Sequence, residues 1–370
     1  MTPAPEGAAL LTIDLAALAA NWRTLAERAA PATCAAVVKA NAYGLGIARA
    51  APALWAAGAR VFFVAQLEEA RTLRALLPAA DIYVLGGLLP GLSASFAGLG
   101  VRPVLGSAPE LAEWSAFCRR SGADLPAAIH VDTGMNRLGL TVEDTLALGA
   151  DRARIGFTPA LVMTHLACAD APGHPLTALQ HERFSRVARA FPGVPASLAN
   201  SAGTLMDPSF HFDLVRPGIA LYGGSAIAGT APLKPVVRLE VPIIQVRDGI
   251  SGESVGYGAA QRLGRASRIA ILSIGYADGF LRAFGASDGS PGAEAVVRGR
   301  RCPLIGRVSM DLTAVDVTDV PDVERGDTAV LLGDGIGIDE LAAHGRTIGY
   351  EVLTSLGERY RRVYLGDFPA

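Results

Sequence analysis

Between residue 35 and about residue 220, short apolar runs alternate with longer segments of helical period. The short runs, rich in β-branched residues, predict eight strands at residues 35–40, 60–66, 81–86, 101–105, 127–132, 160–166, 195–200 and 213–216. Ala-, Leu- and Arg-rich stretches between most of them predict helices, among them residues 67–77, 108–121 and 176–191. Eight strands with intervening helices are typical of a closed (β/α)8 barrel. An open doubly wound sheet is the alternative, but it usually carries a glycine-rich turn after its first strand, which is not found here.

The pattern changes near Lys234 and Pro235. Strand-like runs then follow one another without long helices, at residues 236–246, 269–274, 295–297, 312–317 and 328–332, and short helices are predicted near 338–344 and 347–356. A chain of 370 residues is long enough for two cores. We therefore predict a barrel domain at residues 1–233 and a mostly β domain at residues 234–370, with residues 1–12 as candidates to pair with the second domain.

Composition and charge exclude several classes of protein. Hydrophobic residues make up 51% of the chain and charged residues 18%, which does not fit a disordered protein. The formal net charge is −2 without any basic block, so we expect no nucleic-acid partner. No apolar run of about 18 residues predicts a membrane helix, and the N-terminus lacks the pattern of a signal peptide. These features predict a cytoplasmic protein with no membrane partner.

Metal sites and disulfides are not expected either. The four cysteines are far apart and form no CxxC motif, which favours neither a zinc site nor a disulfide framework. His165, Asp170 and His174 lie close together in the sequence, but their spacing matches no standard set of metal ligands. We therefore predict no metal.

Lysine is rare in this chain. It occurs only at Lys39 and Lys234, and all the other basic residues among the 33 are arginine. Lys39 ends the first predicted strand, at the barrel face where catalytic groups gather. A lysine amine can lose its proton and act as a nucleophile or a base, which arginine cannot do. Lys39 is therefore a candidate for chemistry, with a solvated lysine at a strand end as the alternative, whereas Lys234, before a proline at the domain junction, has a structural interpretation.

Several motifs resemble those of bacterial alanine racemases. The run AVVKANAYGLG at residues 36–46 is similar to the lysine motif that binds pyridoxal phosphate in that family. Further similar motifs follow in the same order: DTGMNRLG at 132–139, THLACAD at 164–170, NSAG at 200–203, RPGIALYG at 216–223, VGYG at 255–258, IGYADG at 274–279, RVSMD at 307–311 and YEVL at 350–353. The resemblance covers nearly the whole chain and implies a (β/α)8 barrel followed by a β domain.

The resemblance also implies an activity and a cofactor. Alanine racemases interconvert L-alanine and D-alanine, which supplies D-alanine for peptidoglycan, and they use pyridoxal phosphate. A lysine amine forms an imine with the aldehyde of this cofactor, and the cofactor then stabilises a carbanion at Cα. Racemisation needs proton transfer on both faces of Cα. The resemblance assigns these two transfers to Lys39 and Tyr257.

The remaining site residues are likewise implied by the resemblance. Ten residues are expected at the cofactor: Lys39, Tyr43, Leu85, His165, Asn200, Ser201, Arg216, Gly218, Ile219 and Tyr350. Within this set, Arg216 faces the pyridine nitrogen and is oriented by His165, while Tyr43, Ser201, Gly218, Ile219 and Tyr350 serve the phosphate. Four residues are expected at the substrate: Arg137, Tyr276, Met310 and Asp311. In the family, Tyr257, Tyr276, Met310 and Asp311 reach the barrel of the other subunit, so a homodimer with shared sites is expected.

One position departs from the family pattern. Many members have a lysine two residues before the DTGM run, where its carbamate can hold the substrate-site arginine. This chain has His130 there, and a histidine cannot form a lysine carbamate. We predict that Arg137 is held by His130, by a bound anion such as chloride, or by another carboxylate.

Three alternatives to alanine racemisation stay open at this point. A racemase of broader specificity typically carries an export signal, and decarboxylases of basic amino acids have different motifs. A non-catalytic protein that stores or delivers pyridoxal phosphate would be a barrel without a β domain, which the segments around Tyr257 and Met310 disfavour. The sequence also leaves open whether the protein is a biosynthetic or a catabolic form.

Overall fold

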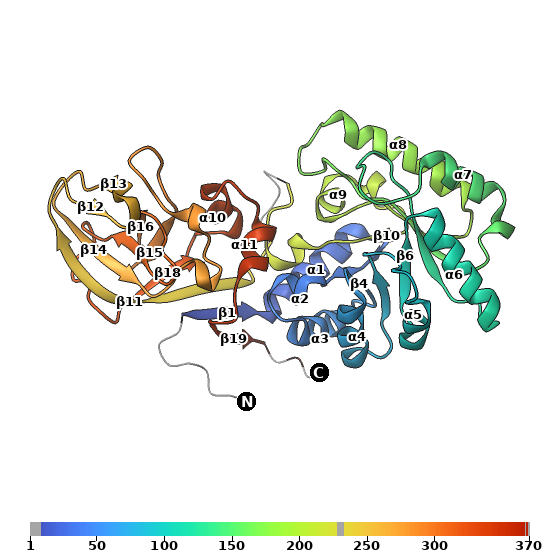
Figure 1. Ribbon diagram of the computed structural model, residues 1–370, viewed down its shortest axis with the longest axis horizontal. Helices are drawn as coiled ribbons and strands as arrows, with labels where there is room; N and C mark the ends of the chain where they lie inside the picture. Colours follow the sequence, from blue (N-terminus) through green and yellow to red (C-terminus); the bar gives the residue numbers. More distant parts are fainter. Residues whose placement is uncertain (1–8, 228–232, 367, 369–370) are drawn as a thin grey trace.

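A parallel barrel and a mostly antiparallel β domain lie side by side in the computed structural model, which describes residues 9–227, 233–366 and 368 (Figure 1). The barrel strands are β2 (Thr33–Cys34), β3 (Ala36–Val37), β4 (Val61–Val64), β5 (Asp81–Val84), β6 (Arg102–Leu105), β7 (Ala127–His130), β8 (Pro159–Met163), β9 (Ala196–Ser197) and β10 (Leu214–Val215). Strands β3 to β9 form one parallel sheet in sequence order. Most positions in these strands are buried, as expected for parallel strands covered on both faces.

The sheet curls round until β10 closes it. Strand β10 pairs in parallel with β2, with Leu214 opposite Thr33. On its other side, the Arg216 N–H donates to the Ala199 carbonyl just after β9 at 2.9 Å. The predicted (β/α)8 fold is therefore confirmed, with the first barrel strand divided into β2 and β3.

Helices surround the barrel (Figure 1). They are α1 (Leu15–Ala29), α3 (Ile47–Ala57), α4 (Leu67–Leu76), α5 (Ser93–Leu99), α6 (Ala108–Ser121), α7 (Val142–Ala150), α8 (Pro175–Ala190) and the short α9 (Ser201–Met206). Local sequence explains where they begin and end. In α6, for example, the Ser107 hydroxyl accepts from the Glu110 N–H at 3.4 Å, and the helix ends at Gly122 with a φ of +64°.

The second domain is built on an eight-stranded sheet in the order β14-β17-β16-β15-β18-β11-β1-β19. Its strands are β1 (Leu10–Asp14), β11 (Val237–Gly249), β14 (Ser267–Leu272), β15 (Glu294–Val297), β16 (Arg300–Ile305), β17 (Thr313–Asp316), β18 (Thr328–Leu332) and β19 (Arg361–Leu365). A small hairpin of β12 (Ser254–Val255) and β13 (Gln261–Arg262) and the helices α10 (Ile338–His344) and α11 (Gly349–Ser355) complete the domain. Strands β16 and β19 were not predicted from the sequence.

Strand β1 lies within the second domain although it precedes the barrel in the chain. It is antiparallel to β11, with Leu10 opposite Glu240, and parallel to β19, with Leu10 opposite Arg361. Of residues 1–12, which the sequence placed against the second domain, residues 1–8 lie outside the described part. In the part of the chain that the structure describes, no helix is both long enough and apolar enough to cross a membrane.

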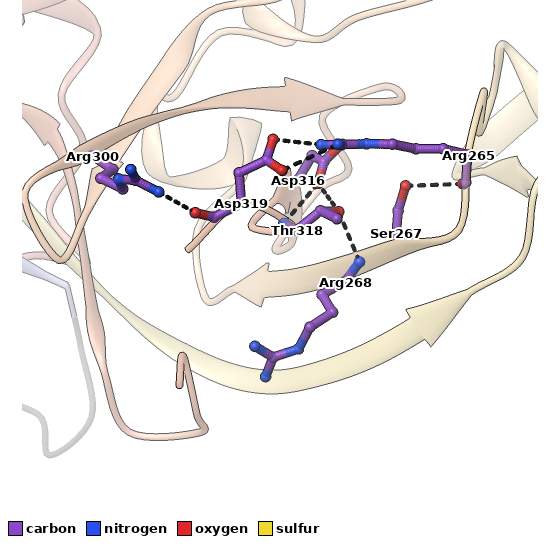
Figure 2. A network of polar contacts seen from close by, with 7 residues as sticks. All are labelled: Arg265, Ser267, Arg268, Arg300, Asp316, Thr318 and Asp319. Atoms are coloured by element: carbon purple, nitrogen blue, oxygen red, sulfur yellow. Dashed lines mark hydrogen bonds and ion pairs between the residues drawn. The ribbon is translucent and has the colours of Figure 1, made fainter. Parts of the chain in front are cut away.

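Polar contacts of surface arginines connect neighbouring strands and turns of the second domain. Figure 2 shows Arg265, just before β14, aimed at the Asp319 carboxylate, with Nη2 2.5 Å and Nη1 3.1 Å from its two oxygens. Arg300 donates to the Asp319 carbonyl, and the Arg268 N–H donates to the Thr318 hydroxyl at 2.9 Å. These contacts join β14 and β16 to the turn that follows β17.

Candidate active site

A cavity lies at the carboxyl ends of the barrel strands, where α11 of the second domain closes over the barrel. Its lining comprises Val37, Lys39, Tyr43, Leu85, His165, Asn200, Ser201, Arg216, Gly218, Ile219 and Tyr350. All ten residues that were expected at a cofactor lie here, although they span more than 300 positions of the chain. Nine come from segments that follow barrel strands, and Tyr350 comes from α11. A barrel brings such residues together because its parallel strands all end at one face.

Lys39 begins an unusual turn. Ala40, Asn41, Ala42 and Tyr43 have φ values of 53°, 54°, 55° and 55°, so four successive non-glycine residues are left-handed. Each such residue costs about 1–2 kcal/mol relative to a right-handed conformation. The turn is therefore held by contacts from elsewhere in the molecule rather than by the preferences of its own residues.

The second domain supplies some of these contacts. Arg362 of β19 donates from Nη1 to the Gly44 carbonyl at 2.6 Å, and the Tyr364 hydroxyl donates to the Leu45 carbonyl at 3.0 Å. Glycine is required at position 46, because its φ is +100° and a Cβ there would lie 2.4 Å from the Tyr364 oxygen. The carboxyl-terminal strand thus supports the turn that carries Lys39.

The Lys39 amine is free to react. It forms no hydrogen bond or ion pair with any residue that the structure describes. Burial lowers the pKa of Lys39, the positive charge of Arg137 lowers it further, and the negative charge of Glu69 acts in the opposite direction. A lowered pKa increases the neutral, nucleophilic fraction of the amine near pH 7.

Arg216 is a buried residue of the cavity lining and has no acidic partner among the described residues. It donates to the Ser197 hydroxyl and, from Nη2, to the carbonyls of Thr164 at 2.5 Å and Leu198 at 3.4 Å. The same Nη2 lies 3.5 Å from Nδ1 of His165. Burial lowers the pKa of Arg216 to about 9, so the guanidinium stays charged at neutral pH. Neutral acceptors therefore position a full positive charge in the lining of the cavity.

Two histidines near this charge are held neutral. Burial, followed by the charge of Arg216 and then that of Arg137, lowers the pKa of His130 to about 4. The same causes lower the pKa of His165 well below its usual value. Because both rings are neutral at pH 7, neither adds a charge to the cavity.

Three hydroxyl groups also line the cavity. Among the described residues, the hydroxyls of Tyr43, Ser201 and Tyr350 donate to no acceptor, and burial raises the pKa of both tyrosines. The Ser201 oxygen accepts from the Gly218 N–H at 2.8 Å, which orients its own proton elsewhere. A Cβ at position 218 would lie 2.1 Å from the Tyr43 oxygen, so only glycine fits. Three donors without acceptors suit an anionic group.

Five expected site residues do not line this cavity, and four of them lie on the second domain. Tyr257, Met310 and Tyr276 lie on the second domain with 70%, 54% and 43% of their surface exposed. Asp311 is also exposed, and its Oδ1 lies 2.8 Å from Nη1 of Arg359. The hairpin of β12 and β13, which flanks Tyr257, is at the end of the molecule remote from the barrel (Figure 1).

Arg137 follows β7, and its charge acts on Lys39, His130 and His165. Two of the three predicted partners of Arg137 were His130 and a carboxylate. Within the described residues, Arg137 forms no hydrogen bond with His130 and no ion pair with a carboxylate. The third, a bound anion, stays a prediction.

Comparisons with known proteins agree along the whole chain. The family model "Alanine racemase, N-terminal domain" matches residues 13–226, and "Alanine racemase, C-terminal domain" matches residues 236–364. An alanine racemase of a Methylobacterium species is 54% identical over 99% of this chain and 100% of its own length. The chain belongs to the alanine racemase family. Solved alanine racemase structures are similar in fold as well as in sequence.

Two of these structures cover almost all of the chain. The alanine racemase of Bartonella henselae, solved with covalently bound pyridoxal phosphate, has a TM-score of 0.91 and 40% identity over 97% of this chain and 99% of that one. The biosynthetic alanine racemase of Pseudomonas aeruginosa has a TM-score of 0.88 and 38% identity over the same shares.

Some residues that shape the cavity of this alanine racemase fold were not predicted from the sequence. Val37 lines it directly. Tyr222 stacks on Tyr43 with ring centroids 4.6 Å apart and donates to the Val37 carbonyl at 3.0 Å. Glu69 binds the turn after Lys39. The position of Tyr222 in the RPGIALYG motif was visible, but a stacking partner of Tyr43 could be recognised only in the folded chain.

Proposed function

We propose that this protein interconverts L-alanine and D-alanine with pyridoxal phosphate as its cofactor. One observation carries the proposal: the Lys39 amine, three hydroxyls and a buried guanidinium share a cavity, and within the described part of the chain the amine is unpaired, the hydroxyls have no acceptor and the guanidinium has no acid. These groups match the aldehyde, the phosphate and the ring nitrogen of pyridoxal phosphate. Membership of the alanine racemase family supports the same activity.

The fit of the cofactor assigns roles to the lining residues. Lys39 would hold the aldehyde, and the hydroxyls of Tyr43, Ser201 and Tyr350 would bind the phosphate. Arg216 would face the ring nitrogen, while Leu85, His165, Asn200, Gly218 and Ile219 complete the cavity. When bound, the cofactor supplies an electron sink that stabilises negative charge at the substrate Cα. A charged Arg216 disfavours protonation of the ring nitrogen, because two cations would then be adjacent.

Racemisation requires a proton donor and acceptor on each face of Cα. The Lys39 amine, with its lowered pKa, serves one face. The Tyr257 hydroxyl serves the other, and Arg137 binds the substrate carboxylate. Tyr276, Met310 and Asp311 restrict the entrance, which favours a side chain as small as that of alanine.

A homodimer completes this site. Tyr257, Tyr276 and Met310 are large side chains that one chain leaves exposed, and such residues mark interaction surfaces when they gather on one domain. We assign residues 234–370 together with strand β1 to the second domain and the rest of residues 1–233 to the barrel, and infer that each second domain covers the barrel of the other subunit in a two-fold dimer. The proposed setting is the cytoplasm, where D-alanine is made for peptidoglycan.

Mixing two inactive variants tests the proposal. Lys39→Ala and Tyr257→Ala homodimers should each lack racemisation, measured with L-alanine in deuterated water. When the two are unfolded and refolded together in equal amounts, half of the dimers are mixed, and each mixed dimer has one intact site. Activity should therefore return to about a quarter of the wild-type level.

The controls separate the parts of the proposal. Each variant refolded alone should stay inactive. No recovery in the mixture would refute the shared site, and a wild-type protein that exchanges no Cα proton of alanine would refute the activity. Wild-type protein that binds pyridoxal phosphate but racemises other amino acids equally well would refute the preference for alanine.

A further inference from the structure

Glu69 forms a contact that the proposed reaction does not yet explain. Its Oε1 accepts from the Ala40 N–H, the residue after Lys39, at 2.5 Å. Its Oε2 accepts from the N–H groups of Ala65 and Gln66 at 2.7 and 3.0 Å. One half-buried carboxylate thus joins the lysine turn to the loop after β4. No other bond from the Ala40 N–H is formed within the described residues.

The ordinary role of this side chain accounts for only part of the geometry. Glu69 is the third residue of α4, and together with Gln66 it forms a capping box at the start of that helix. A capping box satisfies donors of its own helix. The bond to Ala40 reaches 29 positions along the chain, into the preceding strand–helix unit.

Glu110 provides an internal comparison, because it makes the same arrangement in α6. Its Oε2 accepts from the Gly106 N–H at 2.9 Å, and its Oε1 accepts from the Leu88 N–H in the preceding loop at 2.8 Å. The two carboxylates differ in what they hold. Glu110 holds the loop at Leu88, whereas Glu69 holds the residue next to Lys39.

The turn that Glu69 holds is the one most in need of support. Residues 40–43 are all left-handed without a glycine among them. Their far end is fixed by Arg362 and Tyr364 of the second domain. Their near end, at Ala40, is fixed by Glu69. Without this bond the turn can relax toward conformations that its residues prefer, and the Lys39 side chain would move with it.

We propose that Glu69 is a positioning residue, whose carboxylate clamps the left-handed turn after Lys39 and so fixes where the Lys39 amine lies. This inference rests on the proposed function of Lys39. The charges around the amine support it, since Arg137 lowers the pKa of Lys39 and Glu69 opposes that effect. Glu69 therefore acts on Lys39 both through the backbone and through its charge.

The test compares Glu69→Ala with Glu110→Ala in the full-length protein, with and without pyridoxal phosphate. Both variants lose a helix cap and a bond between loops, so both should unfold at lower temperature. Only Glu69→Ala should speed hydrogen exchange in the peptide of residues 38–46, by about tenfold, because a charge-assisted hydrogen bond is lost there. Only Glu69→Ala should also slow the reductive trapping of pyridoxal phosphate on Lys39 by borohydride.

Kinetics provide a further measurement. A displaced Lys39 should lower kcat for alanine by about 10²-fold in Glu69→Ala and leave KM within about threefold, because misplacement of the reacting group affects the chemical step. Glu69→Gln keeps one acceptor oxygen and should give intermediate exchange and trapping rates. It also serves as the test variant if Glu69→Ala does not fold. Glu68→Ala, a change at the neighbouring exposed residue, should match the wild type.

Each outcome decides the inference. Equal effects of Glu69→Ala and Glu110→Ala on exchange at residues 38–46, on trapping and on kcat would overturn it and leave Glu69 as a helix cap. A wild-type protein that traps the cofactor but does not racemise alanine would refute the proposed function while the exchange comparison still tests the clamp.

Discussion

Several arginines of the second domain have acidic partners, and the cations at the barrel mouth differ from them in this respect. In the second domain, Arg265 and Arg298 each pair with one acid, Asp319 and Asp327, and Arg301 pairs with two (Figure 2 shows the first). At the barrel mouth, Lys39, Arg137 and Arg216 have no acidic partner within the described residues. The paired arginines and Arg137 are exposed and Lys39 is half-buried, whereas Arg216 has only 4% of its surface exposed.

The difference in pairing indicates that the two sets of charges have different roles. Exposed ion pairs contribute little to stability, because water screens them and ordering two long side chains opposes the gain. A buried charge without a partner is unfavourable to folding. The charge of Arg216 is nevertheless present, beside hydroxyl donors that have no acceptor among the described residues and beside a reactive amine. This combination fits a site whose ligand supplies the missing negative charge and the missing acceptors.

The largest expected effect comes from removing the reactive amine. Lys39→Ala should lower racemisation by at least about 10⁴-fold, since the loss of an acid–base group alone reaches that range and the covalent attachment is lost as well. The absorbance of the lysine-bound cofactor should disappear. Lys234→Ala is the matched control because it removes the only other lysine. Comparable losses in both variants would contradict the special role of Lys39.

Arg137 tests whether an unpaired cation serves the substrate. Arg137→Gln should raise KM for alanine by about 10- to 100-fold, the range expected when a hydrogen bond to a charged group is lost. Binding of pyridoxal phosphate, followed by absorbance, should change little. Arg265→Gln removes a paired arginine in the second domain and should leave both quantities unchanged. An unaltered KM in Arg137→Gln would show that the substrate carboxylate binds elsewhere.

A single hydroxyl should have a smaller effect. Tyr43→Phe keeps the ring that stacks on Tyr222 and removes one donor, so the dissociation constant of pyridoxal phosphate should rise about tenfold. Pyridoxal without its phosphate should bind the variant and the wild type equally. If both ligands are weakened to the same extent, the hydroxyl does not face the phosphate.

The smallest effect is a pH dependence. The pKa of His130 is lowered to about 4 in the fold, and its usual value of 6.5 applies to the unfolded chain. The unfolded chain therefore binds the proton first as pH falls, and stability is lost below pH 6.5. Between pH 6 and pH 5 the loss should be about 1 kcal/mol. His130→Gln should remove this part of the slope in denaturant titrations of the protein without cofactor, and an unchanged slope would contradict it.

Sequence reasoning predicted the barrel and the members of the cofactor cavity for different reasons. The strands were visible because buried parallel strands are continuous apolar runs, and the face at which they end made Lys39 a candidate for chemistry. Tyr350 came only from the family resemblance, since nothing local indicates that α11 lies over the barrel. Their functional roles stay proposals.

Other features depend on contacts that no local pattern encodes. Ala40 and Ala42 favour right-handed helix, and contacts from distant residues such as Glu69, Arg362 and Tyr364 support their left-handed backbone. Strands β16 and β19 were missed because each begins with two arginines and places several residues in solvent. The positions of Tyr257 and Met310 on an exposed face also depend on tertiary structure.

Strand β1 has a consequence for how the chain acquires its shape. It lies between β11 and β19, so an inner strand of the second domain is contributed by residues made before the barrel, and its neighbour β19 by residues made after the other strands of the sheet. During synthesis on the ribosome, the second domain cannot finish its sheet until residue 365 has emerged. Cutting the chain at the junction between the two domains would leave this sheet without an inner strand. The second domain therefore needs the N-terminal part of the chain to fold completely, although each domain has its own architecture.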